Sequence, residues 1–493
     1  MSVIELLKNE LNTPSKMTTT ENGDCAYLSS GNANLDFFGL AGAARHNQVL
    51  VSVLFRKALA EDMAMAIKNM FYLRDIRSGL GERNSFRNCF SIFCKQYPQL
   101  AERFFPLVVK YGRFDDLFLA KDTFAEDAML NFIGAQLKAD IACQENGQSY
   151  SLLSKWMPSI NATSKSSLRM ANFFANRLGY RKAEYRKLLS RLRKGKIVEN
   201  HLREKDYSFS YESVPAKALS KYRSAFERND GDRYEEFIRL ALKNPSAIKA
   251  KTLFPYDIIR EYSLTMNPLQ KDAMQAKWNA LPRIARNSNT IVVRDGSGSM
   301  EYYQNGLPLL IATSLAILFA EQLTGEFANH FITFSSKPQL VELPAKWSLY
   351  QKLKHCYEFN DYTNTDISKV YDLIFQTSLK INNPTDYIRR IVIISDMEFD
   401  EGTAKVPTYE SMKERFDKAG IPLPEIVYWN VQARHPHFAS SEEQPNIRFV
   451  SGASHHIIQS ILDNKAVDAY EMMKGTLEKY DEVNALLDGK YTR

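Results

Sequence analysis

The sequence has little cysteine, and its cysteines have no spacing typical of a disulfide framework or a cysteine-rich zinc site. There are 5 cysteines in 493 residues, they are scattered, and no two are spaced as C-x-x-C. An odd and scattered set is typical of reduced thiols. The first residues also lack a secretory signal pattern. We therefore expect a cytoplasmic protein.

Long apolar runs and common nucleotide-binding motifs are also missing. The longest apolar run, residues 307–320, is interrupted by Thr313 and Ser314. It is shorter than the ~20 residues that a membrane-spanning helix needs, so it predicts a buried helix and no membrane partner. Neither G-x-G-x-x-G nor G-x-x-x-x-G-K-[ST] occurs, and no H-E-x-x-H is present. The best-known phosphate-cradling loops and zinc-protease motifs are thereby excluded.

Net charge by itself does not indicate a partner. The formal net charge is +7, from 64 basic and 57 acidic residues. Such a small excess does not imply nucleic acid unless it is concentrated somewhere. The length of the chain predicts two or more domains, because one core does not usually grow so large.

The two halves of the chain differ in hydrophobic pattern. Residues 35–277 show apolar residues at three- and four-residue spacing, typical of helices, and helix pairs of roughly 40 residues would suit a HEAT-like arrangement. After residue 289, apolar strands such as "TIVVR", "RIVIIS" and "EIVYWNV" alternate with helical stretches, which predicts a parallel sheet covered by helices. We therefore expect an α plus α/β fold. The expected parts are a flexible segment 1–31, a helical domain 32–277, and a Rossmann-like domain with a C-terminal helix, 289–493.

The stretch "IVVRDGSGSM" places Asp295, Ser297 and Ser299 directly after an apolar strand. In parallel sheets, ligands bind beyond the carboxyl ends of the strands. Asp396 follows another very apolar strand, and Thr363 or Thr365 opens a helix. These side chains offer only oxygen atoms, which suit Mg²⁺ or Mn²⁺, or less tightly Ca²⁺. The alternative for the serine loop alone is a simple glycine-rich turn.

These residues resemble the metal-ion-dependent adhesion site (MIDAS) of von Willebrand factor A domains. "VVRDGSGSM", "TNTD" and "IISDME" match the three loops of that family. The resemblance implies that Ser297, Ser299 and one threonine bind the metal directly, with Thr365 favoured over Thr363. It also implies that one coordination position stays open for a carboxylate of a protein partner. The predicted magnesium site comprises Asp295, Ser297, Ser299, Thr365 and Asp396.

An enzymatic interpretation is weaker. A haloacid-dehalogenase-type phosphatase also begins with an aspartate after its first strand, but carries a second one where this chain has Ser297. A serine cannot transfer the proton that the second acid supplies. We therefore expect a protein that is not an enzyme. Arg294, just before the loop, either places a cation near the site or points outward.

Two other groups are given structural interpretations. The histidine pairs His435/His437 and His455/His456 have no cysteine or acidic residue close by in the sequence, so we expect exposed loop or cap residues. Charged residues around Arg74, and Arg113 with Asp115 and Asp116, predict ion-paired corners between helices. Stretches "LRDIRSGLGER", "KWMPS" and "SDMEFDE" resemble a domain-of-unknown-function family that joins a TROVE-like helical region to an A domain. A more distant resemblance is to the Ro ribonucleoprotein autoantigen family, which implies binding of small noncoding or misfolded RNA by analogy only.

One region concentrates positive charge. Residues 151–205 contain 14 Lys or Arg against 3 Glu and no Asp, a net charge of +11. Such a strip can bind a phosphate backbone, and Tyr180 and Tyr185 either stack on bases or lie in the core. The alternative is a solvated helix face. The predicted RNA-binding residues are Arg177, Arg181, Lys182, Arg186, Lys187, Arg191, Arg193, Lys194 and Lys196.

Together these features predict a monomeric, Ro-like RNA-binding protein whose metal site binds an acidic protein partner. The alternative is a protein-interaction adaptor that uses the metal site in a stress or defence assembly without nucleic acid.

Overall fold

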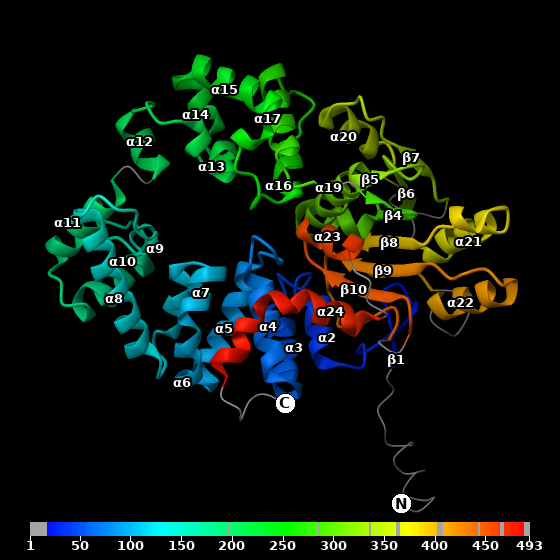
Figure 1. The fold of residues 1–493 in the computed structure, drawn as a ribbon, viewed down its shortest axis with the longest axis horizontal. Helices are drawn as coiled ribbons and strands as arrows, with labels where there is room; N and C mark the ends of the chain where they lie inside the picture. The colour runs from blue at the N-terminus through cyan, green and yellow to red at the C-terminus, as the bar shows by residue number, and fades with distance from the viewer. Residues whose placement is uncertain are drawn as a thin grey trace, which may run out of the picture. The chain divides into compact units, whose positions relative to one another are not determined.

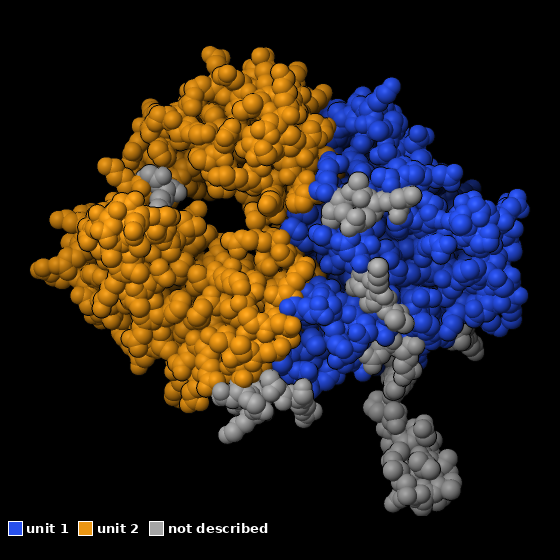
Figure 2. All heavy atoms as spheres, viewed as in Figure 1, with its two compact units in different colours: residues 1–66, 283–478 blue, residues 67–282, 479–493 orange. Residues whose placement is uncertain are grey.

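The computed structural model describes residues 17–194, 197–283, 286–334, 337–360, 365–401, 408–441, 444–463 and 468–487. The chain packs into two compact units, which Figure 2 colours separately. Unit 1 comprises Met1–Ala66 and Arg283–Glu478, and unit 2 comprises Ile67–Pro282 and Lys479–Arg493. The boundaries of these two units differ from the boundaries of the three predicted domains. The predicted domain boundaries stay a prediction.

Unit 1 is built on a six-stranded sheet with the order β10-β9-β8-β4-β6-β7. Five strands run parallel, and β7 pairs antiparallel with β6 because the short connection between them leaves no room for a crossover helix. The strands are β4 (Thr290–Asp295), β6 (His330–Phe334), β7 (Leu340–Glu342), β8 (Arg390–Ser395), β9 (Glu425–Asn430) and β10 (Ile447–Ser451). The predicted helical region followed by a mostly parallel sheet is confirmed.

The strand order changes direction between β4 and β8. Successive strands are added on one side of β4 as far as β7, and on its other side from β8 to β10. Such a reversal is the point where open α/β sheets bind ligands. Since Arg294 is in register with Ile394, Asp295 and Ser395 lie side by side at the carboxyl ends of these two strands.

Helices pack against this sheet (Figure 1). The strongly apolar α19 is almost wholly buried against β4, β6 and β8, as predicted. The helical stretch Gly298–Gln322 is apolar enough to cross a membrane by length and composition, but 72% of its window is buried inside the protein. In the described part of unit 1, the helices of eight or more residues are α2 (Ala33–Leu40), α3 (Gln48–Glu61), α19 (Leu307–Gln322), α20 (Leu349–Tyr357), α21 (Ile367–Ser378), α22 (Thr408–Ala419), α23 (His456–Asp463) and α24 (Ala469–Leu477).

The N-terminal part of the chain belongs to unit 1. Strands β1 (Met17–Thr19) and β2 (Cys25–Tyr27) form a hairpin, and Tyr27 exchanges two backbone hydrogen bonds with Phe438, at 2.8 and 2.9 Å. Of the segment predicted to be flexible, residues 17–31 are thus ordered by contacts with distant residues, whereas residues 1–16 lie outside the described part of the chain. A short polar segment carries no sequence signal for such long-range pairing.

The regular elements in the described part of unit 2 are helices, apart from one isolated bridge between Pro215 and Lys249. Its longer helices include α4 (Met63–Arg74, which begins in unit 1), α5 (Arg83–Gln96), α8 (Glu126–Glu145), α10 (Lys165–Arg177), α11 (Lys182–Arg193), α15 (Gly231–Lys243) and α17 (Pro268–Asn279). The shorter ones among the described residues are α6 (Pro98–Ala101), η1 (Glu102–Phe104), α7 (Phe105–Tyr111), η2 (Phe114–Ala120), α9 (Leu153–Trp156), α12 (Val198–Glu204), η3 (Tyr211–Ser213), α13 (Ala216–Lys221), α14 (Arg223–Asn229), η4 (Pro245–Ala247), α16 (Pro255–Ile259) and most of η7 (Glu478–Leu486). Part of its core is an aromatic cluster in which Phe71 packs against Phe86, Phe104 and Tyr111.

The two predicted ion-paired corners of unit 2 are one buried network. Arg74 binds Asp116 at 2.8 Å with both side chains almost fully buried, and Arg87 donates to the same carboxylate at 2.6 Å. Arg113 binds Asp115 at 2.8 Å. The sequence predicted two separate ion-paired corners, but Arg74 and Arg87 pair with Asp115 and Asp116 of the second group.

Candidate functional site

The serine loop begins where β4 ends, with a carboxylate held out of water. Asp295 is fully buried. Its Oδ1 accepts a hydrogen bond from the backbone N–H of Ser297 at 2.9 Å, and its Oδ2 accepts one from the hydroxyl of Ser395 at 2.5 Å. The hydroxyl oxygens of Ser297 and Ser299 lie 3.1 Å apart. The loop therefore collects one carboxylate and two hydroxyls at the predicted place.

The second predicted aspartate, Asp396, joins this cluster from the end of β8. It is buried to 2% exposure, and a hydrogen bond links it to Ser299. Burial, followed by the negative charge of Asp295, raises the pKa of Asp396 to about 7, although Arg434 acts in the opposite direction. Burial also raises the pKa of Asp295. Two adjacent buried carboxylates repel each other, so a bound cation would relieve a real electrostatic cost.

Two arginines lie beside this oxygen cluster, which we define as Asp295, Ser297, Ser299 and Asp396. Arg434 donates to Oδ2 of Asp396 at 3.0 Å and lies over the ring of Tyr303 at 4.3 Å. Arg294 is fully buried, donates to the carbonyl oxygen of Phe359 at 3.0 Å, and lowers the pKa of Asp295 by its charge. Of the two alternatives for Arg294, the structure matches the cation near the site.

Thr365 takes part in a different hydrogen-bond network. Its hydroxyl lies 2.6 Å from Oδ1 of Asp400 and 3.0 Å from the carbonyl oxygen of Glu398, and it accepts a hydrogen bond from the side-chain amide of Asn22 at 2.9 Å. The four residues of the oxygen cluster are thus brought together, and Thr365 is hydrogen-bonded elsewhere. Thr363 lies outside the described residues, so the choice between the two threonines stays a prediction.

A second group of potential metal ligands was missed by sequence reasoning. Glu398, two residues after Asp396, lies between His435 and His437, and the three side chains could hold a metal ion. The interpretation of this histidine pair as exposed residues without an acidic neighbour was wrong for His437, which is 5% exposed. Burial raises the pKa of Glu398. Contacts with His437, with the backbone N–H of Glu21 and with His435 act in the opposite direction and lower this pKa to about 2. The only sequence signal was the alternation H-P-H, because Glu398 is distant in the chain.

The interpretation as an exposed residue was also wrong for His455, which is buried to 5% exposure.

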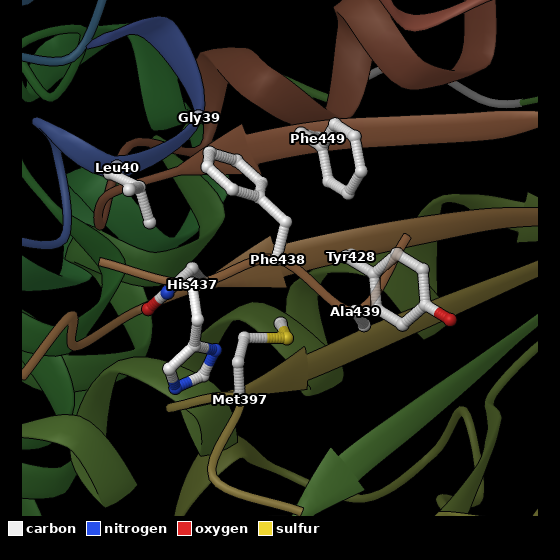
Figure 3. Close-up of a pocket in the computed structure, with 9 residues that line it drawn as sticks. Gly39, Leu40, Met397, Tyr428, His437, Phe438, Ala439 and Phe449 are labelled. Atoms are coloured by element: carbon white, nitrogen blue, oxygen red, sulfur yellow. The ribbon is translucent and has the colours of Figure 1, made fainter. Parts of the chain in front are cut away.

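Close to His437 there is a cavity of about 20 Å³ lined by apolar side chains that include Met397, Phe438 and Phe449 (Figure 3). A cavity of this size holds about one water molecule. It therefore offers no room for an organic substrate.

In unit 2, the predicted RNA-binding residues lie mainly on α11. Four of them, Lys182, Arg186, Lys187 and Lys194, are exposed and have no ion pair within the described part of the chain. Three others are ion-paired: Arg177 to Glu126 and Asp127, Arg181 to Glu184, and Arg191 to Glu145 at 3.5 Å. Lys196 lies outside the described residues.

Two predicted contributors to RNA binding have structural roles. Arg193 is partly buried and donates to the carbonyl oxygen of Ser154 at 2.8 Å, and burial lowers its pKa. Tyr185 is fully buried and donates to the carbonyl oxygen of Pro158 at 3.1 Å. Of the two alternatives for this tyrosine, the structure matches the core residue. The remaining cationic surface is narrower than the sequence suggested.

Fold and site together define a helix-rich protein with a mostly parallel sheet and an oxygen-rich loop cluster at the carboxyl edge of that sheet. Residues 20–108 and 127–290, just over half of the chain, match a family described as a domain of unknown function (DUF2828). The chain belongs to this family, which confirms the resemblance to a domain-of-unknown-function family. Residues 289–490 match a second domain of unknown function (DUF7788).

Two individual proteins are similar to the chain. "Uncharacterized protein L728" of Acanthamoeba polyphaga mimivirus is 26% identical, over 94% of this chain and 88% of the viral protein. The crystal structure of the Deinococcus radiodurans RO (RSR) protein is similar with a TM-score of 0.36 and 10% identity, covering 89% of this chain and 93% of that one. The TROVE-like and A-domain assignments stay predictions.

Proposed function

We propose that this protein binds RNA through the cationic surface of α11 and its C-cap, defined as Lys182, Arg186, Lys187 and Lys194. The observation that carries the proposal is that these four exposed cations have no ion pair among the described residues. They lie in a segment of net charge +11. Exposed cations so close together repel one another, and a phosphate backbone removes that repulsion while releasing its own counterions.

Charge reversal tests this proposal. The triple variant Lys182→Glu, Arg186→Glu, Lys187→Glu should weaken binding of a fluorescent single-stranded RNA at least about tenfold near 0.1 M salt, and should flatten the salt dependence of the affinity. A matched control reverses Lys243, Lys249 and Lys251, which are exposed residues of unit 2 outside this segment. Equal affinities of the two variants would refute the assignment.

The chain isolated at low salt offers an independent measurement. We expect co-purified RNA, visible as a high ratio of absorbance at 260 and 280 nm, which is lost in high salt because the contacts are electrostatic. Sequencing would then separate small noncoding RNA, the class that the sequence resemblance implies, from random RNA.

We further propose that the oxygen cluster binds Mg²⁺, with Thr365 or Thr363 completing it, and that the metal binds a carboxylate of a protein partner. The buried pair of Asp295 and Asp396 supports this, because only a cation stabilises both carboxylates in their charged forms. The proposed activity is binding by a cytoplasmic monomer, without catalysis. A pulldown tests the alternative adaptor function. If the chain captures a protein only with Mg²⁺, also after nuclease treatment, and the Asp295→Asn variant does not capture it, the adaptor function is favoured over RNA binding.

A further inference from the structure

We propose that Glu398, His435 and His437 form a binding site for a divalent first-row transition metal such as Zn²⁺, distinct from the oxygen cluster. We call these three residues the histidine site. They combine two imidazole nitrogens with one carboxylate, a donor set that suits Zn²⁺, Fe²⁺ or Co²⁺ better than Mg²⁺.

The spacing of the donor atoms fits one small ion. Nδ1 of His435 lies 3.0 Å from Oε1 of Glu398, Nε2 of His437 lies 3.1 Å from Oε2, and all the donor atoms are within 4.8 Å of one another. Ligand atoms at tetrahedral positions around zinc are about 3.3 Å apart, given bonds of about 2.0–2.1 Å. Small side-chain movements would therefore place all three donors around a metal ion.

Both imidazoles face the same carboxylate from one short loop. His435 and His437 flank Pro436 in the loop after β9, where residues 434–436 form a bend. The two rings are nearly parallel, with centroids 6.5 Å apart and an interplanar angle of 21°.

Burial leaves a donor atom of this site unsatisfied. The side chains of Glu398 and His437 are 1% and 4% exposed. Nε2 of His437 has no hydrogen-bond partner within the described part of the chain, although Glu398 is close, so the two groups are not aligned as a hydrogen bond. An unsatisfied buried ring nitrogen is costly, and a metal bond would satisfy it. His435, which is 55% exposed, leaves a path for an ion from solvent.

Neighbouring groups hold the carboxylate and favour a cation. The backbone N–H of Glu21 donates to Oε2 of Glu398 at 2.7 Å, the kind of outer contact that orients a metal ligand. Arg434 lies 4.0 Å from Glu398 but is also paired with Asp396 and Glu21. The single charge of Arg434 is thus shared among three carboxylates, and a divalent ion at the histidine site would add positive charge beside Glu398.

Metal titration of the full-length chain tests the proposal. The chain is freed of metal with a chelator and titrated with Zn²⁺ against a chromophoric indicator, and then with Co²⁺, whose visible absorption reports nitrogen and oxygen ligation. We expect one tight Zn²⁺ ion per chain that millimolar Mg²⁺ does not displace. His435→Ala, at the exposed ligand, and Glu398→Gln should each weaken binding at least about tenfold.

A matched control uses a histidine beside a carboxylate that has no second histidine. His355 on α20 lies 3.3 Å from Glu358, the residue that caps this helix, and His355→Ala should leave the Zn²⁺ affinity unchanged. Because Glu398 is buried, folding of each variant is checked by circular dichroism, and His435→Ala decides the matter if Glu398→Gln does not fold. Unchanged Zn²⁺ affinity in His435→Ala, or displacement of Zn²⁺ by millimolar Mg²⁺, would overturn the proposal.

Discussion

At the scale of single residues, burial decides the chemistry of this protein more than residue type does. Asp295 and Asp396 are ordinary carboxylates in the sequence, but their pKa values rise because both are buried beside each other. His455 is buried without a hydrogen-bond partner for either ring nitrogen among the described residues. Each of these residues therefore makes stability depend on ions or pH.

The carboxylate pair predicts stabilisation by Mg²⁺. A saturating concentration, about 100 times the dissociation constant, should raise the free energy of unfolding by roughly 2–3 kcal/mol. Asp295→Asn should abolish this gain, because it removes a carboxylate from the oxygen cluster. Thermal denaturation with Mg²⁺ or chelator measures it, and Asp372→Asn, at an exposed ion pair with Arg415, is the control. A gain that persists in Asp295→Asn would place the ion elsewhere.

His455 predicts acid sensitivity. Burial, followed by the charge of His456, lowers its pKa from 6.5 to about 3. Below pH 6.5 the unfolded chain binds a proton that the folded protein does not, so this contribution to stability is complete above pH 6.5 and is lost as the pH falls towards 3. The loss approaches about 1.4 kcal/mol per pH unit. In urea titrations between pH 7 and 5, His455→Phe should lose less stability than the native chain, and equal losses would contradict the prediction.

At the scale of secondary-structure elements, charged pairs connect helices that are separated in sequence. The carboxylate of Asp116, in η2, accepts hydrogen bonds from Arg74 of α4 and Arg87 of α5. It also accepts a hydrogen bond from the backbone N–H of Arg113, at 3.0 Å. One fully buried carboxylate thus orders three segments of unit 2. Short amphipathic helices gain most of their stability from such tertiary contacts.

Asp116→Asn should destabilise unit 2 by roughly 3–5 kcal/mol, because it leaves the buried charge of Arg74 without its counter-ion. The ion pair of Arg239 with Glu235 on the surface of α15 provides the comparison, since Arg239→Ala should cost at most about 1 kcal/mol. Urea unfolding followed by circular dichroism measures both. Similar losses in the two variants would mean that the network contributes little.

At the scale of the whole molecule, unit 1 is assembled from the two ends of a long sequence. Its N-terminal hairpin contacts loops more than 340 residues away: the amide of Asn22 donates to Thr365 and to the carbonyl oxygen of Glu398, and Thr20 donates to the carbonyl oxygen of Phe399. The loop that carries Asp396 and Glu398 is therefore supported by residues 20–22.

A chain that lacks residues 1–31 should consequently unfold at lower urea concentration than one that lacks residues 1–16, which keeps all of these contacts. The longer deletion removes the three hydrogen bonds of Thr20 and Asn22, the two between Tyr27 and Phe438, and the one from Glu21 to Glu398, each of which contributes about 0.5–1.5 kcal/mol. Equal unfolding midpoints of the two truncated chains would show that the hairpin does not stabilise unit 1.

The sequence by itself determined the apolar strands and the oxygen-bearing side chains that follow them. The strands before Asp295 and Asp396 are continuous apolar runs, so periodicity placed both aspartates at the carboxyl ends of parallel strands, and the family resemblance joined them in one site. Only the tertiary structure decided which charges pair and which histidines are buried. Glu398 meets His435 and His437, and Asp116 meets Arg74, because loops and helices far apart in the chain fold together. Local sequence patterns carry no information on such contacts between residues that are distant in the chain.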